Sequence, residues 1–104
     1  MISVNSKNNR LIRLTDERTR HITKNHPEMK SCVSWILETI ENPDFIFAGD
    51  FGELIASRLY EKTPVTNDKF LMVVYKETTK FDGFILTAYF CRSINKTRRI
   101  VWKP

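Results

Sequence analysis

The sequence predicts an α+β fold in which two N-terminal helices pack on one face of a four- to five-stranded antiparallel sheet. Its 104 residues suffice for one domain. Apolar residues recur at helical spacing between Met29 and Ile40. After Pro43 the apolar period changes to two, and short polar loops separate the apolar runs, as antiparallel neighbours require. We expect a flexible N-terminus over residues 1–10 and a single domain over residues 11–104.

The first helix should begin after Thr15, whose hydroxyl suits an N-cap and which precedes two acidic residues in the first turn. It should end near Asn25, because the residue before Pro27 is pushed out of the helical region. The second helix should begin at Pro27 and end at the Asn42-Pro43 pair. Its apolar stripe faces the core.

Strands are predicted by β-branched and aromatic residues between turn signals. Before the first helix, Ile12 and Leu14 form either a short strand or an apolar contact. After the helices, the expected strands are 45–48, 54–62, 70–76, 84–92 and 98–102.

Alternation sorts the long strands into two faces. If the connecting loop closes symmetrically, Val74 faces Thr87 and Lys76 faces Ile85. The apolar face, expected beneath the helices, holds Leu71, Val73, Tyr75, Phe84, Leu86, Ala88, Phe90, Arg92, Ile100 and Trp102. The other face mixes hydroxyls and cations on an apolar floor and holds Met72, Val74, Lys76, Thr87, Tyr89 and Arg99.

The net charge of +5 is unevenly spread. Residues 1–30 carry seven basic and three acidic residues, residues 31–60 one and five, and residues 61–104 nine and four. If the basic ends meet, one face could attract a polyanion. The alternative is a solvated surface that keeps a small protein soluble.

Several classes of protein are disfavoured. No apolar run approaches the ~20 residues of a membrane helix, and no secretory signal precedes the domain, so we expect a cytoplasmic protein without membrane contact. Cys32 and Cys91 lack CxxC spacing and are expected to be buried thiols. Because zinc spacing, a Walker loop and GxGxxG are missing, we expect no metal and no cofactor.

The chain has two histidines, His21 and His26. Five residues turn about 140° on a straight helix, so the two would not share a helix face, but Pro27 releases His26 from that restriction. Imidazole titrates near neutrality and can remove and return a proton. RNA cleavage by the ribose 2′-hydroxyl needs a base, an acid and cations for the phosphorane charge, and this chain offers all three.

Four segments together resemble a known family: LTDERTRHITKNHPEM at 14–29, ETIENPDFI at 38–46, LMVVYKE at 71–77 and FILTAYF at 84–90. In this order they are similar to phage-associated nuclease modules of the barnase–EndoU–colicin–RelE (BECR) group. The resemblance covers roughly residues 11–103. It implies a RelE-like layout and a metal-independent endoribonuclease that leaves a 2′,3′-cyclic phosphate. It also implies a toxin or effector of phages or mobile elements.

By position, the resemblance implies a site made of His21, His26, Lys76, Thr87 and Tyr89. One histidine, His26 by preference, acts as base or acid, and Thr87 and Tyr89 orient the phosphate or sugar. Substrate-binding cations complete this site: Lys76 stabilises the phosphorane together with Arg58 or Arg92, and Arg99 lies on the same face of the sheet. A symmetric register, however, puts Arg58 and Arg92 on the helix-covered face.

Two further readings stay open. One is a non-catalytic RNA- or ribosome-binding module, and the other is an interaction protein that docks through the acidic segment 31–60. The expected partner is RNA, with transfer, messenger and ribosomal RNA unresolved, and an antitoxin or immunity protein is a second partner.

Overall fold

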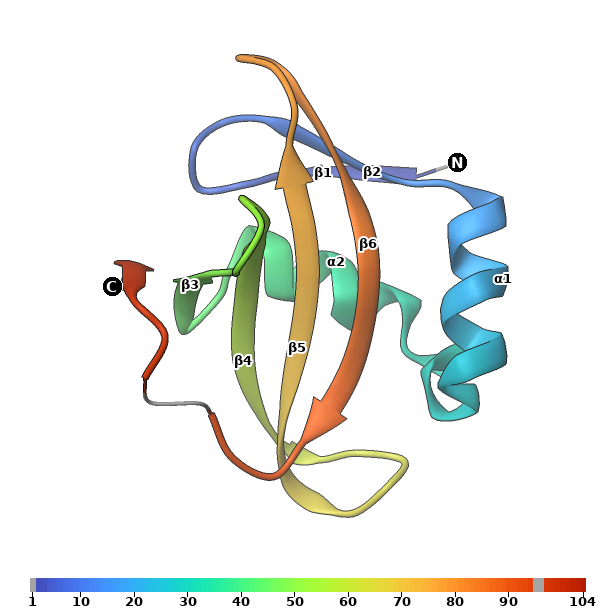
Figure 1. Ribbon diagram of the computed structural model, residues 1–104. Helices are drawn as coiled ribbons and strands as arrows, with labels where there is room; N and C mark the ends of the chain where they lie inside the picture. The colour runs from blue at the N-terminus through green and yellow to red at the C-terminus, as the bar shows by residue number, and fades with distance from the viewer. Residues whose placement is uncertain (1, 95–96) are drawn as a thin grey trace.

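The computed structural model describes residues 2–94 and 97–104, which form one sheet with helices on one face (Figure 1). The described part holds seven strands. The elements are β1 (Ile2–Asn5), β2 (Leu11–Leu14), α1 (Asp16–Asn25), the 3₁₀ helix η1 (Pro27–Ser31), α2 (Val33–Glu41), β3 (Phe45–Ala48), β4 (Leu54–Lys62), β5 (Asn67–Glu77), β6 (Asp82–Cys91) and β7 (Ile100–Trp102). The strand order is β1-β2-β6-β5-β4-β3-β7, and the one parallel pair in this part of the chain is β2 with β6.

The predicted four- to five-stranded antiparallel sheet behind two N-terminal helices is therefore wrong. The sheet is mixed, and a hairpin, β1–β2, precedes the helices. In β2, Ile12 and Leu14 are buried while Leu11 and Arg13 are exposed, which is the alternation of a half-buried strand. The polar composition of residues 1–10 hid β1, because an edge strand needs few buried side chains.

The parallel pair depends on a close approach at Gly83. This residue is buried opposite Ile12, and a Cβ there would collide with the Lys76 carbonyl and with Ile12 Cδ1. Leu11 N also donates to the Phe81 carbonyl at 2.7 Å. Glycine thus lets β2 lie against the start of β6. The chain then runs from β2 directly into α1.

The helices match the prediction in part. Thr15 Oγ1 accepts a hydrogen bond from Arg18 N at 3.1 Å, which confirms the N-cap, and α1 ends at Asn25 as expected. The second helix is interrupted at Cys32, whose N–H bonds to the Met29 carbonyl three residues back. This 3₁₀ turn still keeps one buried stripe, formed by Met29, Cys32, Ile36 and Ile40.

The main core lies between the helices and one face of the sheet. The sheet contributes Ala56, Leu71, Val73, Tyr75, Ile85 and Ala88. On the opposite face, which is called the second face of the sheet, a smaller cluster centres on Phe47, Ile55 and Met72.

The register between β5 and β6 decides which side chains share the second face. Val74 pairs with Thr87, as predicted. One residue later a bulge inserts Leu86, so Lys76 pairs with Phe84 and not with Ile85. The predicted place of Phe84 on the helix-covered face is therefore wrong, because Phe84 shares the face of Lys76 and is 37% exposed.

Candidate active site at the open edge of β6

The outer edge of β6 is only partly covered by another strand. Among the described residues, β2 pairs with Asp82–Phe84, and no strand pairs with this edge farther along. Helix α1 lies beside the uncovered part (Figure 1). Arg18 Nη1 donates to the Leu86 carbonyl at 3.4 Å, so a helix side chain satisfies one backbone acceptor of the edge. The first turn of α1 is thereby held near the middle of β6.

His26 follows α1 and lies at this edge. Its backbone has φ −133° and ψ 78°, outside the helical region, while its N–H still donates to the Ile22 carbonyl at 2.7 Å. Its ring centroid is 5.9 Å from that of Tyr89, with a tilt of 32° between the rings. Its Nδ1 lies 3.6 Å from Glu28 Oε1. The helix break before Pro27 thus delivers an imidazole to the strand.

Tyr89 is half-buried and lies on the second face of the sheet. Burial is the main cause that raises the pKa of its hydroxyl, with a smaller effect of Cys91, while the positive charge of Arg98 works in the opposite direction. The hydroxyl is therefore protonated at neutral pH and can donate a hydrogen bond to a phosphate oxygen.

Thr87 shares the face of Tyr89. It stands two residues before Tyr89 on β6, a separation of ~7 Å along the strand. Lys76 is on the same face but farther away. Met72 pairs with Tyr89, and Lys76 stands four residues beyond Met72 on β5, or ~13 Å along the strand. The structure thus brings His26 and Tyr89 together, places Thr87 two residues before Tyr89 on the same face, and places Lys76 at the far end of that face.

His21 occupies an exposed position on α1, where its Nε2 lies 3.2 Å from Asn25 Nδ2. That partner stands one turn farther along the same helix. Its part in a site with His26 remains a prediction.

The three arginines predicted to bind substrate lie apart. Arg58 is on the helix side, where Nη1 donates to the Asn42 carbonyl at 2.6 Å and Nε is 3.4 Å from Glu38 Oε1. These contacts tie the end of α2 to β4. Arg92 is exposed just beyond β6. Their roles toward a substrate remain predictions.

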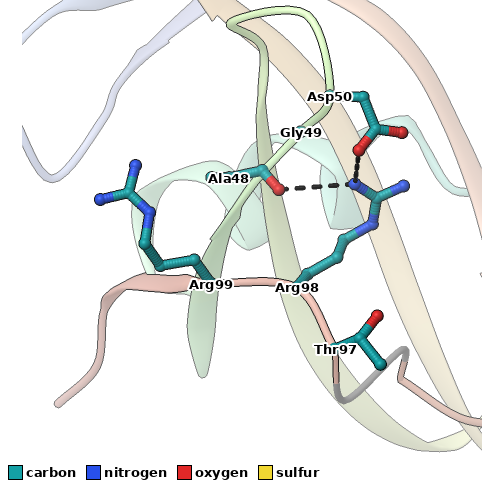
Figure 2. Close-up of a pocket in the computed structure, with 6 residues that line it drawn as sticks. All are labelled: Ala48, Gly49, Asp50, Thr97, Arg98 and Arg99. Atoms are coloured by element: carbon teal, nitrogen blue, oxygen red, sulfur yellow. Dashed lines mark hydrogen bonds and ion pairs between the residues drawn. The ribbon is translucent and has the colours of Figure 1, made fainter.

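Arg98 takes the position expected for Arg99. It lines the hollow beside Tyr89, whereas Arg99 extends the opposite way (Figure 2). Ile100 also lies with Phe47 on the second face, so its predicted place beneath the helices is wrong, and alternation directs Arg99 away. The Arg98-Arg99 pair was visible in the sequence, but its orientation follows from the pairing of β7 with β3.

Arg98 is anchored at two points. Its Nη1 donates to Asp50 Oδ1 at 3.2 Å and to the Ala48 carbonyl at 3.5 Å (Figure 2). Both acceptors belong to the end of β3 and the turn after it. The guanidinium is thus held between that turn and the second face of the sheet.

Other features of the described residues bear on chemistry. No three His, Cys, Asp or Glu side chains within residues 2–94 and 97–104 are grouped so that they could hold a metal ion. Cys32 is buried, as expected, while Cys91 is only half-buried, and both are free thiols. In the same ranges, no helix has the length and hydropathy needed to cross a membrane.

Comparison with protein-family models, with curated proteins and with solved structures gives no match to this chain.

Proposed function

We propose that this chain is a metal-independent endoribonuclease whose site is the open edge of β6. The observation that carries the proposal is the approach of His26 to Tyr89, with ring centroids 5.9 Å apart, beside Thr87 on the same strand. An imidazole next to a phenol, with a threonine hydroxyl two residues along the same strand face, is a suitable set for moving protons around a phosphate. The net charge of +5 favours a polyanionic substrate.

The proposed reaction is a transesterification. A base removes the proton of the ribose 2′-hydroxyl, and the 2′-oxygen forms a bond to phosphorus. The bond from phosphorus to O5′ then breaks, and an acid gives O5′ its proton. The products are a 2′,3′-cyclic phosphate and a 5′-hydroxyl, and no other reactant is consumed.

In this scheme His26 transfers one of the two protons, and His21 is the candidate for the other. The hydroxyls of Tyr89 and Thr87 donate hydrogen bonds to the phosphate oxygens. Lys76 and Arg98 supply positive charge on the same face of the sheet. From the resemblance to the BECR nuclease modules, we further propose that the chain acts in the cytoplasm as a phage or mobile-element toxin, with an antitoxin or immunity protein as its partner.

The test is incubation of the purified chain with a fluorescent single-stranded RNA, with and without EDTA. We expect EDTA-resistant cleavage whose downstream product carries a 5′-hydroxyl and is phosphorylated directly by polynucleotide kinase. His26→Ala should remove this cleavage while the circular dichroism spectrum stays unchanged. Binding without cleavage would instead support the RNA- or ribosome-binding module, and the absence of binding at low salt would contradict both.

A further inference from the structure

A cavity of about 260 Å³ opens on the second face of the sheet, next to the proposed catalytic edge. Its floor is apolar and consists of Phe47, Ile55 and Met72, each at most 5% exposed. Tyr89 and Arg98 also line it, so a phenol ring and a guanidinium border the same space. Because Tyr89 also approaches His26, this cavity and the catalytic edge share a residue.

A second hollow of about 300 Å³ lies beyond Arg98 (Figure 2). It is formed by the turn at Ala48–Asp50 and by residues 97–99, and it includes both Arg98 and Arg99. Arg98 therefore lines the apolar cavity as well as the polar hollow. Tyr89 thus connects the edge of β6 to the cavity, and Arg98 connects the cavity to the hollow.

This sequence of surfaces matches the chemistry of a nucleotide. Unstacked bases bind to aromatic rings and guanidinium planes over apolar surface, and phosphates bind to arginine. Asp50 is 71% exposed, and an exposed ion pair contributes little to stability, so Arg98 can exchange this carboxylate for a phosphate.

We infer that the cavity binds one unstacked base of single-stranded RNA, next to the scissile phosphate, and that the hollow beyond Arg98 holds the adjoining phosphate. This inference rests on the proposed function, since it places the base relative to the catalytic edge. A base in a duplex is stacked and paired and does not reach such a cavity without being flipped. The substrate class is therefore single-stranded RNA or loops.

The first test scans a short 2′-O-methyl RNA, which resists cleavage, with one abasic residue at each position in turn. Fluorescence anisotropy measures binding to the wild-type chain. We expect one position whose abasic form weakens binding roughly tenfold or more, because base–aromatic stacking has about that effect. The duplex of the same sequence should bind more weakly than the single strand. A flat scan overturns the inference.

The second test uses paired variants. Met72→Phe fills the cavity from its floor, and Leu59→Phe makes a similar change on an exposed part of the same sheet face. Arg98→Met and Arg13→Met each remove one arginine that pairs with an aspartate, but Arg13 pairs with Asp82 away from the cavity. We expect Met72→Phe and Arg98→Met to abolish the position-specific effect, and both controls to retain it. Equal effects of Arg98→Met and Arg13→Met would show that Arg98 acts only through the net charge of the chain, and would overturn its proposed role at the cavity.

A third test uses the wild-type chain alone and measures the rate at which Cys91 is alkylated. Cys91 lines the cavity, whereas Cys32 is 1% exposed. Bound single-stranded RNA should slow alkylation of Cys91 severalfold, and an unchanged rate contradicts occupancy of the cavity. Base binding in 2′-O-methyl RNA without any cleavage of natural RNA would remove the proposed nuclease and keep the binding cavity. Cleavage together with a flat abasic scan would keep the proposed nuclease and remove the binding cavity.

Discussion

The ring centroids of His26 and Tyr89 lie 5.9 Å apart, although His26 follows a helix and Tyr89 belongs to a strand. Two features bring them together. The helix ends before Pro27, which turns His26 out of α1, and Arg18 holds α1 against the Leu86 carbonyl on the edge of β6. The proposed chemistry depends on this contact, so the first predictions concern its two members.

Replacing His26 by alanine should lower the rate of RNA cleavage by at least about 100-fold, which is the lower end of what general acid–base catalysis contributes. Lys24→Ala removes a basic side chain from the last turn of α1, two residues before His26, and is the matched control. Initial rates on a single-stranded RNA provide the measurement. A His26→Ala rate within threefold of the wild type would remove this residue from the mechanism. A loss in His21→Ala as large as in His26→Ala would identify the second proton carrier.

Tyr89→Phe keeps the ring and removes the hydroxyl. We expect cleavage to slow by at least about tenfold, because a hydrogen-bond donor to the phosphate is lost. Burial raises the pKa of Tyr89 above its ordinary value of 10.0, so the wild-type hydroxyl stays protonated at pH 9. The ratio of wild-type to Tyr89→Phe rates should therefore be the same at pH 7 and pH 9. A ratio that falls toward one at pH 9 would show that the hydroxyl ionises earlier.

Tyr60 predicts a dependence of stability on alkaline pH. Its hydroxyl donates to Glu38 Oε1 at 2.7 Å, its ring stacks on Trp35 at 4.7 Å, and burial is the main cause that raises its pKa to about 12. The folded chain holds this proton more tightly than the unfolded chain, where the pKa is 10.0. The contribution of Tyr60 to stability is therefore full below pH 10 and is lost as pH rises from 10 to 12.

Tyr60→Phe keeps the stacking and removes the proton, so urea unfolding should show a shallower loss of stability between pH 10 and 12 than in the wild type. At pH 7 the variant should be less stable by about 1 kcal/mol, the usual net value of one hydrogen bond. Parallel curves for the two proteins above pH 10 would show that Tyr60 is not the group that titrates.

Glu77 joins the N-terminal hairpin to β5. Its carboxylate accepts from Ser6 Oγ at 3.0 Å and Asn8 Nδ2 at 2.8 Å, lies 3.5 Å from Arg10 Nε, and has a side chain only 6% exposed. Glu77→Gln should lower the free energy of unfolding by about 1–3 kcal/mol, because the buried Ser6 hydroxyl and the partly buried Arg10 lose a charged partner that is itself nearly buried. Glu61→Gln, an exposed glutamate on β4, should change it by less than about 0.5 kcal/mol. Equal stability of the two variants would contradict this account of the hairpin.

Local patterns predicted much of the fold. The Thr15 cap, the end of α1 at Asn25 and the strand at 54–62 were all read from neighbouring residues, and each agrees with the structure. Caps, proline and alternation act over a few residues, which is why one sequence suffices for them. The pairing of Val74 with Thr87 also agrees with the prediction, but only because the bulge at Leu86 offsets a one-residue shift of the pairs next to the loop.

The errors have a common origin in contacts between distant segments. β1 and β2 join the sheet because β2 lies parallel to the start of β6 beside Gly83, and no pattern within residues 1–14 reveals that partner. The bulge at Leu86 shifts Phe84 to the second face of the sheet. The assumption of a symmetric loop does not predict this bulge. The inward turn of Arg98, instead of Arg99, depends on the pairing of β7 with β3.

By itself the sequence determined the first helix, the buried stripe of the second, most of the strands and the residue types available for chemistry, since these depend on local propensity and spacing. Tertiary structure alone decided that His26 meets Tyr89, that Arg58 ties α2 to β4, and that Arg98 borders a cavity. The physical reason is that side chains from separate elements meet only once helix packing and strand register have placed their backbones.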